Sequence, residues 1–211
     1  MRYTHTYRML LILLLIIVLL LLNLLLGSVS IPAQSIWNIL TGTGNEPVSW
    51  QNIVWKSRLP QALTALAAGA GLAVSGLQMQ TVFRNPLAGP SVLGISSGAS
   101  MGVAFVILLS GSLGGVALSR LGVMGEIALS VAAIIGSLSV MALIVYVSQK
   151  VKGNVTLLII GVMIGYVSNA VIGVLKFFSV EEDIRAYVIW GLGSFSRVSG
   201  NQMMLFVTLM A

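Results

Sequence analysis

Long apolar stretches, each close to the length of a membrane-spanning helix, constrain this chain more than any other feature. They lie at residues 9–26, 61–81, 92–110, 124–147 and 155–177. A helix needs about 20 apolar residues to cross the hydrocarbon core of a bilayer, whereas a barrel strand needs about 9–11. Because lipid offers no partner to free backbone groups, only helices and closed barrels span membranes. The sequence therefore predicts an all-α fold, a polytopic bundle of transmembrane helices.

The small number of charged side chains excludes a water-soluble globule. Hydrophobic residues make up 57% of the 211 residues and charged residues only 8%, against about 25% charged residues in ordinary soluble domains. The net charge of +6 is spread over the connecting segments, with no dense basic run. Anionic lipid head groups explain this charge better than a nucleic acid does. We therefore expect contact with membrane lipid and no binding of nucleic acid.

The first stretch also predicts the orientation of the chain. Met9 to Leu26 is interrupted only by Asn23 and follows Arg2 and Arg8, which favours a cytoplasmic start. The apolar core of a cleaved signal peptide is usually shorter, about 7–15 residues, so a retained anchor is favoured over a cleaved leader. Alternation then places 82–91 and 148–154 inside, and 27–60, 111–123 and 178–199 outside.

A sixth apolar stretch opens near Gly200 and runs to Ala211, where the sequence stops. This length is too short to cross a bilayer. We therefore interpret residues 1–211 as a single but incomplete transmembrane domain, with five spans and the start of a sixth, within a longer polypeptide.

Glycines at four-residue spacing mark two of the stretches. Gly94, Gly98 and Gly102 lie in one, and Gly161 and Gly165 lie in another. Small residues on one helix face let two backbones approach closely in lipid. The pattern predicts close helix packing, and the lining of a substrate path is a second, compatible use.

Gly94-Ile95-Ser96-Ser97-Gly98 matches the G-x-S-x-G motif of serine hydrolases, which requires a strand before it and a histidine base. The single histidine is His5, close to the chain start, and there is no cysteine. A phosphate-binding G-x-x-x-x-G-K-[ST] loop is also absent. We therefore predict no catalytic residue, no metal and no cofactor, and an intramembrane serine hydrolase stays a remote alternative.

Acidic residues are scarce in the predicted spans. Glu126 lies near the start of one stretch, whereas Glu181, Glu182 and Asp183 cluster with Arg185 after another. We expect that cluster to be a solvated outer segment. Ion-coupled transporters commonly use ionisable groups inside a span, and such groups are scarce in the predicted spans. A secondary transporter or channel therefore stays an alternative only.

The most informative segment begins at Arg58-Leu59-Pro60, continues through Gly69, Gly76 and Gln80 to Arg84-Asn85-Pro86-Leu87-Ala88-Gly89-Pro90, and ends at Leu93-Gly94 and Gly98-Ala99. It predicts a helix entered through proline, a rigid turn on the inner face and a glycine-rich helix. This segment closely resembles the permease family of iron-siderophore, haem and cobalamin ATP-binding-cassette importers. The resemblance continues more weakly through 124–195.

The resemblance implies a transport subunit rather than an enzyme, in the cytoplasmic (inner) membrane of a bacterium. It implies about ten helices in a full-length subunit, of which this chain covers about two-thirds. The implied partners are ATP-binding-cassette ATPase subunits, an extracytoplasmic substrate-binding protein and a second permease subunit, as a homodimer. The cargo would be an iron-siderophore, haem or cobalamin, and the residues do not distinguish these chelates.

The resemblance also assigns site residues. Arg58 matches the first of two arginines that receive the binding protein, Gln61 replaces the second, and Lys56 is the expected substitute. The inner gate is expected at Arg84, Asn85, Pro86, Leu87 and Pro90, with Asn154 and Val155 in the next inner loop. Ser168 and Asn169 are the polar candidates for the translocation path, and an interhelical hydrogen bond explains them equally well.

Overall fold

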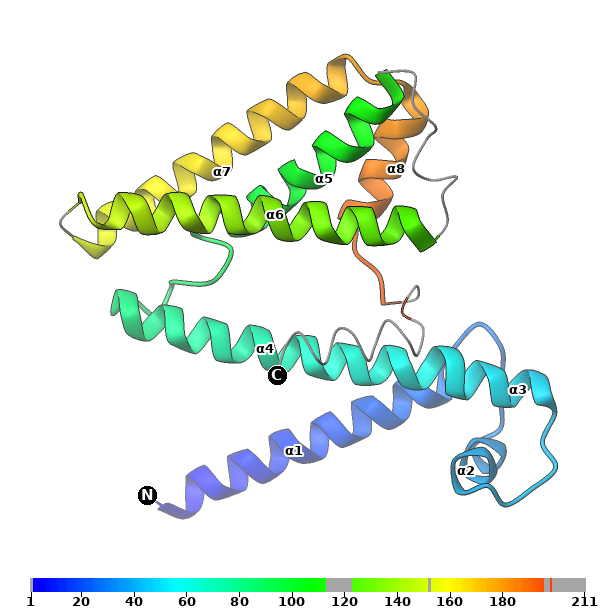
Figure 1. Cartoon of the computed structure of the whole chain (residues 1–211). Helices are drawn as coiled ribbons and strands as arrows, with labels where there is room; N and C mark the ends of the chain where they lie inside the picture. Colours follow the sequence, from blue (N-terminus) through cyan, green and yellow to red (C-terminus); the bar gives the residue numbers. More distant parts are fainter. Residues whose placement is uncertain (1, 113–122, 152, 196–197, 199–211) are drawn as a thin grey trace. The chain divides into compact units, whose positions relative to one another are not determined.

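The computed structural model describes residues 2–112, 123–151, 153–195 and 198, and in these residues all regular structure is helical (Figure 1). The predicted all-α fold is therefore confirmed, while the sixth stretch after Gly200 lies outside the described residues. The elements are α1 (Arg2–Leu25), α2 (Ala33–Thr41), α3 (Val48–Ile53), the π-helical turn η1 (Val54–Arg58), α4 (Leu59–Phe83), α5 (Ile95–Ser112), α6 (Val123–Ser148), α7 (Asn154–Phe177) and α8 (Glu181–Gly191).

Four helical segments of the described chain are long and apolar enough to cross a membrane. They are Thr6–Leu25, Val48–Phe83, Met124–Ser148 and Val155–Phe177. The stretch expected at 92–110 forms a shorter apolar helix, Ile95–Leu109, because the glycine- and proline-containing turn that follows α4 continues as far as Gly94. The expected multi-span architecture is thus confirmed, with one helix shorter than predicted.

The described residues form two compact units, and the boundary between them falls near Gly71, within α4. The expectation of a single membrane domain stays a prediction. In the first unit, α1, α2, α3 and η1 meet around a small apolar cluster of Ile31, Ile36, Ile39 and Val54. This cluster connects the end of α1 to the start of the long helical segment.

A π-helical turn allows that long segment to continue through Pro60. Proline has no backbone N–H, and its ring clashes with the carbonyl four residues earlier in a regular helix, here that of Lys56. In η1 the Leu59 N–H donates to the carbonyl of Val54, five residues back. The wider turn accommodates the proline ring, so α3, η1 and α4 form one uninterrupted helical segment.

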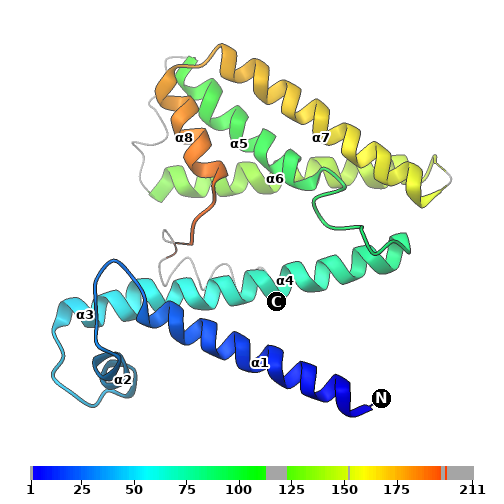
Figure 2. The same cartoon turned by 180° about the vertical axis from the view of Figure 1, so that it is seen from behind.

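In the second unit, α5 packs against α6, α7 and α8 (Figures 1 and 2). One buried cluster joins α5 to α7 and α8 and consists of Val103, Ala104, Ile107, Leu108, Ile172 and Tyr187. A second cluster joins the end of α4 and the following turn to α6 and consists of Phe83, Ala88, Leu93, Val140 and Ile144.

Glycines form close helix contacts in this unit, as the four-residue spacing predicts. A Cβ atom at Gly98 of α5 would lie 2.7 Å from the carbonyl oxygen of Gly136 on α6. At Gly94, where φ is +74°, a Cβ would lie 2.7 Å from the carbonyl oxygen of Gly161 on α7. Real Cβ atoms do not approach other atoms so closely, so both contacts depend on glycine.

Candidate functional site

The turn that follows α4 holds five of the residues expected at the inner gate, and its first residue has an unusual backbone. Arg84 has a φ of +48°. The Arg84 N–H donates to the Thr81 carbonyl at 3.3 Å, and the Asn85 N–H donates to the Gln80 carbonyl at 3.1 Å. This is a Schellman motif, in which the left-handed position is usually glycine.

A non-glycine residue in the left-handed conformation costs roughly 1–2 kcal/mol. The Arg84 side chain is exposed, and within the described part of the chain it forms no ion pair. Strained backbone positions cluster at functional sites. The backbone geometry therefore makes Arg84 a candidate functional residue.

Asn85 closes the turn. Its Oδ1 accepts a hydrogen bond from the Leu87 N–H at 2.9 Å, and its carbonyl accepts one from the Ala88 N–H at 3.1 Å. Ala88 is buried in the cluster around Phe83, whereas Leu87 is 85% exposed. The turn is thus anchored by Ala88 in the buried cluster, and it exposes the apolar side chain of Leu87 at its tip.

The remaining turn residues and the second inner loop lie at the same end of this unit. Pro86 is exposed and Pro90 is half-buried. Leu157 and Leu158, from the first turns of α7, pack on the cluster that contains Phe83 and Ala88. Val155 is 68% exposed, and the side chain of Asn154 lies outside the described part of the chain. The structure therefore brings the two predicted gate segments together.

The two predicted path residues are separated by the structure. Ser168 is only 2% exposed, within the packed face of α7, whereas the neighbouring Asn169 is exposed. Asn169 borders a cavity of about 160 Å³ between the start of α5 and the middle of α7. The cavity is lined by Ser91, Gly94, Ser97, Gly161, Val162, Gly165, Tyr166 and Asn169.

Tyr166, which is 71% exposed, is a lining residue that the sequence analysis missed. The signal was present, because Val162, Tyr166 and Asn169 follow one another at helical spacing on α7. The lining combines hydroxyl and amide groups with glycine backbone and includes no ionisable group apart from the phenol. Such a surface can form hydrogen bonds with a passing solute without holding it by charge.

The remote alternative, a hydrolase elbow at residues 94–98, does not have the structural context that it requires. The elbow requires a strand before the serine, whereas turns occupy 84–94 and Ser96 lies in the first turn of α5. Gly94 and Gly98 instead make the close contacts with α7 and α6. The motif thus serves helix packing.

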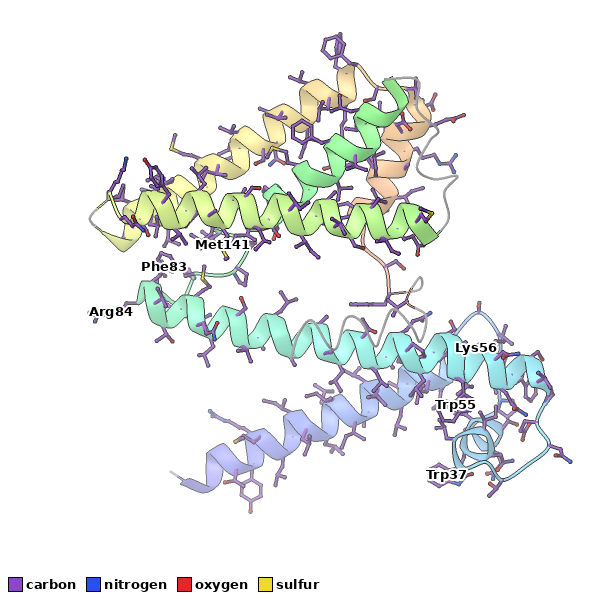
Figure 3. The ribbon with its side chains drawn as sticks, in the orientation of Figure 1. Trp37, Trp55, Lys56, Phe83, Arg84 and Met141 are labelled. Atoms are coloured by element: carbon purple, nitrogen blue, oxygen red, sulfur yellow. The ribbon has the colours of Figure 1, made fainter. Side chains whose placement is uncertain are left out.

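The two predicted docking residues differ in exposure. Lys56 is exposed on η1 (Figure 3). Arg58 is only 5% exposed, and its guanidinium donates to the carbonyls of Leu24 at 2.6 Å, Leu25 at 3.1 Å and Val29. Gln61, at the position of the second family arginine, donates from Nε2 to Ser57 Oγ at 2.9 Å. Of the two predicted docking cations, Lys56 is thus the exposed one and Arg58 the buried one.

The expectation of a wholly solvated acidic segment is wrong for one residue. Glu181, Glu182 and Arg185 of α8 are exposed, but Asp183 is buried and its Oδ2 has no hydrogen-bond partner in the described part of the chain. Burial, assisted by the neighbouring Glu182 carboxylate, raises the pKa of Asp183. Helix α8 packs on α5, and this packing buries the carboxyl.

Comparison with known proteins extends the resemblance over most of the chain. Residues 14–211 match the model of the FecCD transport family. The chain is 34% identical over 185 residues to the hemin transport system permease protein HmuU of Yersinia pestis, covering 87% of this chain and 52% of that protein. It is 35% identical over 160 residues to the vitamin B12 import system permease protein BtuC of Photorhabdus laumondii, covering 75% of this chain and 45% of that protein.

The structure itself is similar to that of a metal-chelate type ABC transporter in an inward-facing conformation. The TM-score is 0.72 at 27% sequence identity, and the match covers 93% of this chain and 56% of the other. The chain thus spans about half the length of the relatives it matches, less than the two-thirds expected from the sequence alone.

Proposed function

Because this chain belongs to the FecCD transport family, we propose that it forms part of the permease subunit of an ATP-driven importer for a metal chelate or related cofactor. The cargo class is an iron-siderophore, haem or cobalamin, carried across the cytoplasmic membrane of a bacterium. The single observation that carries this proposal is the family match over residues 14–211. This range includes the turn that follows α4, the glycine contacts of α5 and helix α7. Hydrolysis of ATP belongs to a separate partner.

The cavity beside α7 supports a role in translocation. A path that must release its cargo needs weak, distributed contacts rather than strong ligands. Asn169, Tyr166 and Ser97 offer hydrogen-bonding groups of this kind, and the backbone of Gly161 and Gly165 leaves room beside them. We assign Asn169 and Tyr166 to the path, and Ser168 supports α7 from its buried face.

The two adjacent inner segments support a gate. Leu87 at the tip of the turn and Val155 at the start of α7 are both apolar and exposed, and their segments share one apolar cluster. In the proposed closed state these side chains exclude water from the path. Arg84, Asn85, Pro86 and Pro90 shape the turn, and Asn154 begins the second segment.

The partners of the proposed importer follow from the family. ATP-binding-cassette ATPase subunits would bind on the inner side, a substrate-binding protein would dock on the outer side over Lys56, and a second permease copy would complete the path. The chain itself contains no phosphate-binding loop that could supply the energy.

Uptake by a strain that lacks the full-length permease tests this function. Labelled ferric siderophore, haem and cobalamin are supplied in parallel, with the partner ATPase either intact or inactivated. Loss of one cargo, together with dependence on the ATPase, supports the proposal and identifies the cargo. Loss of no cargo, or uptake that ignores the ATPase, favours the secondary transporter.

A further inference from the structure

Arg58 is seated on the backbone that ends α1. Its Nη1 lies 2.6 Å from the Leu24 carbonyl oxygen and 3.1 Å from that of Leu25, and its Nη2 donates to the Val29 carbonyl. These partners are 29 to 34 residues away in sequence. One side chain of η1 therefore joins the start of the second long helical segment to the end of the first.

The end of α1 needs such a cation. The last carbonyls of a helix have no partner within it and carry the negative end of the helix dipole. No basic residue occurs in the last turn of α1, so the helix does not supply the charge itself. A buried carbonyl without a hydrogen-bond partner is costly, and the forked guanidinium of Arg58 donates to several carbonyls together.

Gly27 makes room for this contact. A Cβ atom at position 27 would lie 2.8 Å from Arg58 Nη2 and 3.1 Å from its Cζ. The φ of Gly27 is not in the left-handed range, so a side chain there is compatible with the backbone. A substitution at Gly27 would therefore displace the guanidinium without changing any charge.

The π-helical turn connects this contact to the exposed surface. In η1, Val54 and Arg58 are buried, whereas Trp55 is 49% exposed and Lys56 is exposed. In Figure 3 these two side chains lie on different sides of the turn, with Trp55 on the side of α2. A π-helical turn is rare and occurs mostly as a single turn inside an α-helix, so side-chain contacts contribute to fixing its register. Arg58 supplies such a contact on the buried side of the turn.

We propose that Arg58 is a positioning residue: seated on the carbonyls that end α1, it holds the π-helical turn that presents Lys56 and Trp55. Lys56, rather than Arg58, then meets the partner on the outer side. The assignment of Lys56 to docking rests on the proposed function, whereas the hold of Arg58 on α1 does not.

Cysteine labelling measures how the turn is presented. The 211 residues contain no cysteine, so Lys56→Cys in a cysteine-free full-length permease gives a single reporter for a membrane-impermeant maleimide applied to intact cells. Arg58→Gln, Arg58→Lys and Gly27→Val are each added to this background. Gly191→Val is the matched control because, apart from the local backbone of its own helix, no heavy atom of the described residues lies within 4 Å of a Cβ at that position.

We expect Arg58→Gln and Gly27→Val to change the labelling rate at position 56 several-fold and to lower the Tm of the purified permease. Arg58→Lys should keep the labelling rate and the Tm only partly at their parent values, and Gly191→Val should change neither the labelling rate nor the Tm. The proposal is overturned if Gly27→Val labels and melts like the parent, or if Arg58→Lys restores both fully, as a simple docking charge would.

Failure of the proposed function gives a different result. If residue 56 is not labelled from outside in the parent, the expected orientation and the docking role are wrong. The Tm difference between Gly27→Val and Gly191→Val still decides whether Arg58 holds the end of α1.

Discussion

Substitution of Gly98 by alanine tests the packing of α5 against α6. The added Cβ would lie 2.5 Å from Val140 Cγ2 and 2.7 Å from the Gly136 carbonyl oxygen. Carbon atoms in contact normally lie about 3.5–4.0 Å apart, so the helices must separate by roughly 1 Å. The Gly136 oxygen belongs to the backbone and cannot rotate away.

The free-energy change follows from two opposing effects. Overpacking of this kind costs about 1–3 kcal/mol of folding free energy. Alanine has a higher helix propensity than glycine, which stabilises the helix by up to about 1 kcal/mol. We expect a net loss of about 1–2 kcal/mol, which for a chain of this size corresponds to a fall in Tm of roughly 2–8 °C.

Thermal unfolding of the purified permease in detergent measures this loss. Gly173→Ala on α7 is the matched control, because no described heavy atom lies within 4 Å of a Cβ there. The control should melt at the parent temperature or slightly above it. If Gly98→Ala melts no lower than Gly173→Ala, the close contact between α5 and α6 is not what holds the two helices together.

Three further predictions concern single side chains. Asp183→Asn should stabilise the protein at pH 7 by about 1 kcal/mol, because a buried and unpaired carboxylate is removed. Since the pKa of Asp183 is raised in the folded state, this gain in stability should shrink as the pH falls through that raised pKa towards the ordinary value of 3.8. An equal gain at pH 7 and pH 4, measured by thermal unfolding, would contradict the assignment. Arg84→Gly should raise the stability of the protein by roughly 1 kcal/mol, because glycine adopts the left-handed backbone without strain. It should nevertheless lower uptake of the labelled chelate, because the side chain is lost. Unchanged uptake, in both Arg84→Gly and the comparison variant Arg84→Ala, would show that Arg84 is not part of the gate. Asn169→Leu should lower uptake of the labelled chelate several-fold while Ser168→Ala leaves it nearly unchanged, because Asn169 borders the cavity and Ser168 is buried away from it. The reverse order would place the path on the other face of α7.

The membrane-spanning fold could be predicted from the sequence because the bilayer acts as a uniform solvent. Each stretch of about 20 apolar residues is long enough to cross it, and every backbone group must be satisfied within the helix. Local chemistry also predicted the turn at Asn85-Pro86 and the glycine contacts of α5. The shortened start of α5 was missed because Val92 and Leu93 are apolar although they belong to the turn.

The roles of individual polar residues depended on tertiary structure. Ser168 and Asn169 are neighbours in sequence, but packing of α7 on α5 buries the first and leaves the second beside the cavity. Asp183 is part of an acidic run, yet α8 packs on α5 in a way that buries this carboxyl alone among the acids of that run.

Arg58 shows the difference most clearly. The sequence by itself determined that a cation precedes Pro60 at the start of a membrane-spanning helix, and resemblance suggested that it faces a partner. Only the tertiary structure decided that its guanidinium lies on the end of α1. The physical reason is that hydropathy follows from local composition, whereas the partner of a polar side chain depends on which distant backbone groups the fold brings within hydrogen-bonding distance.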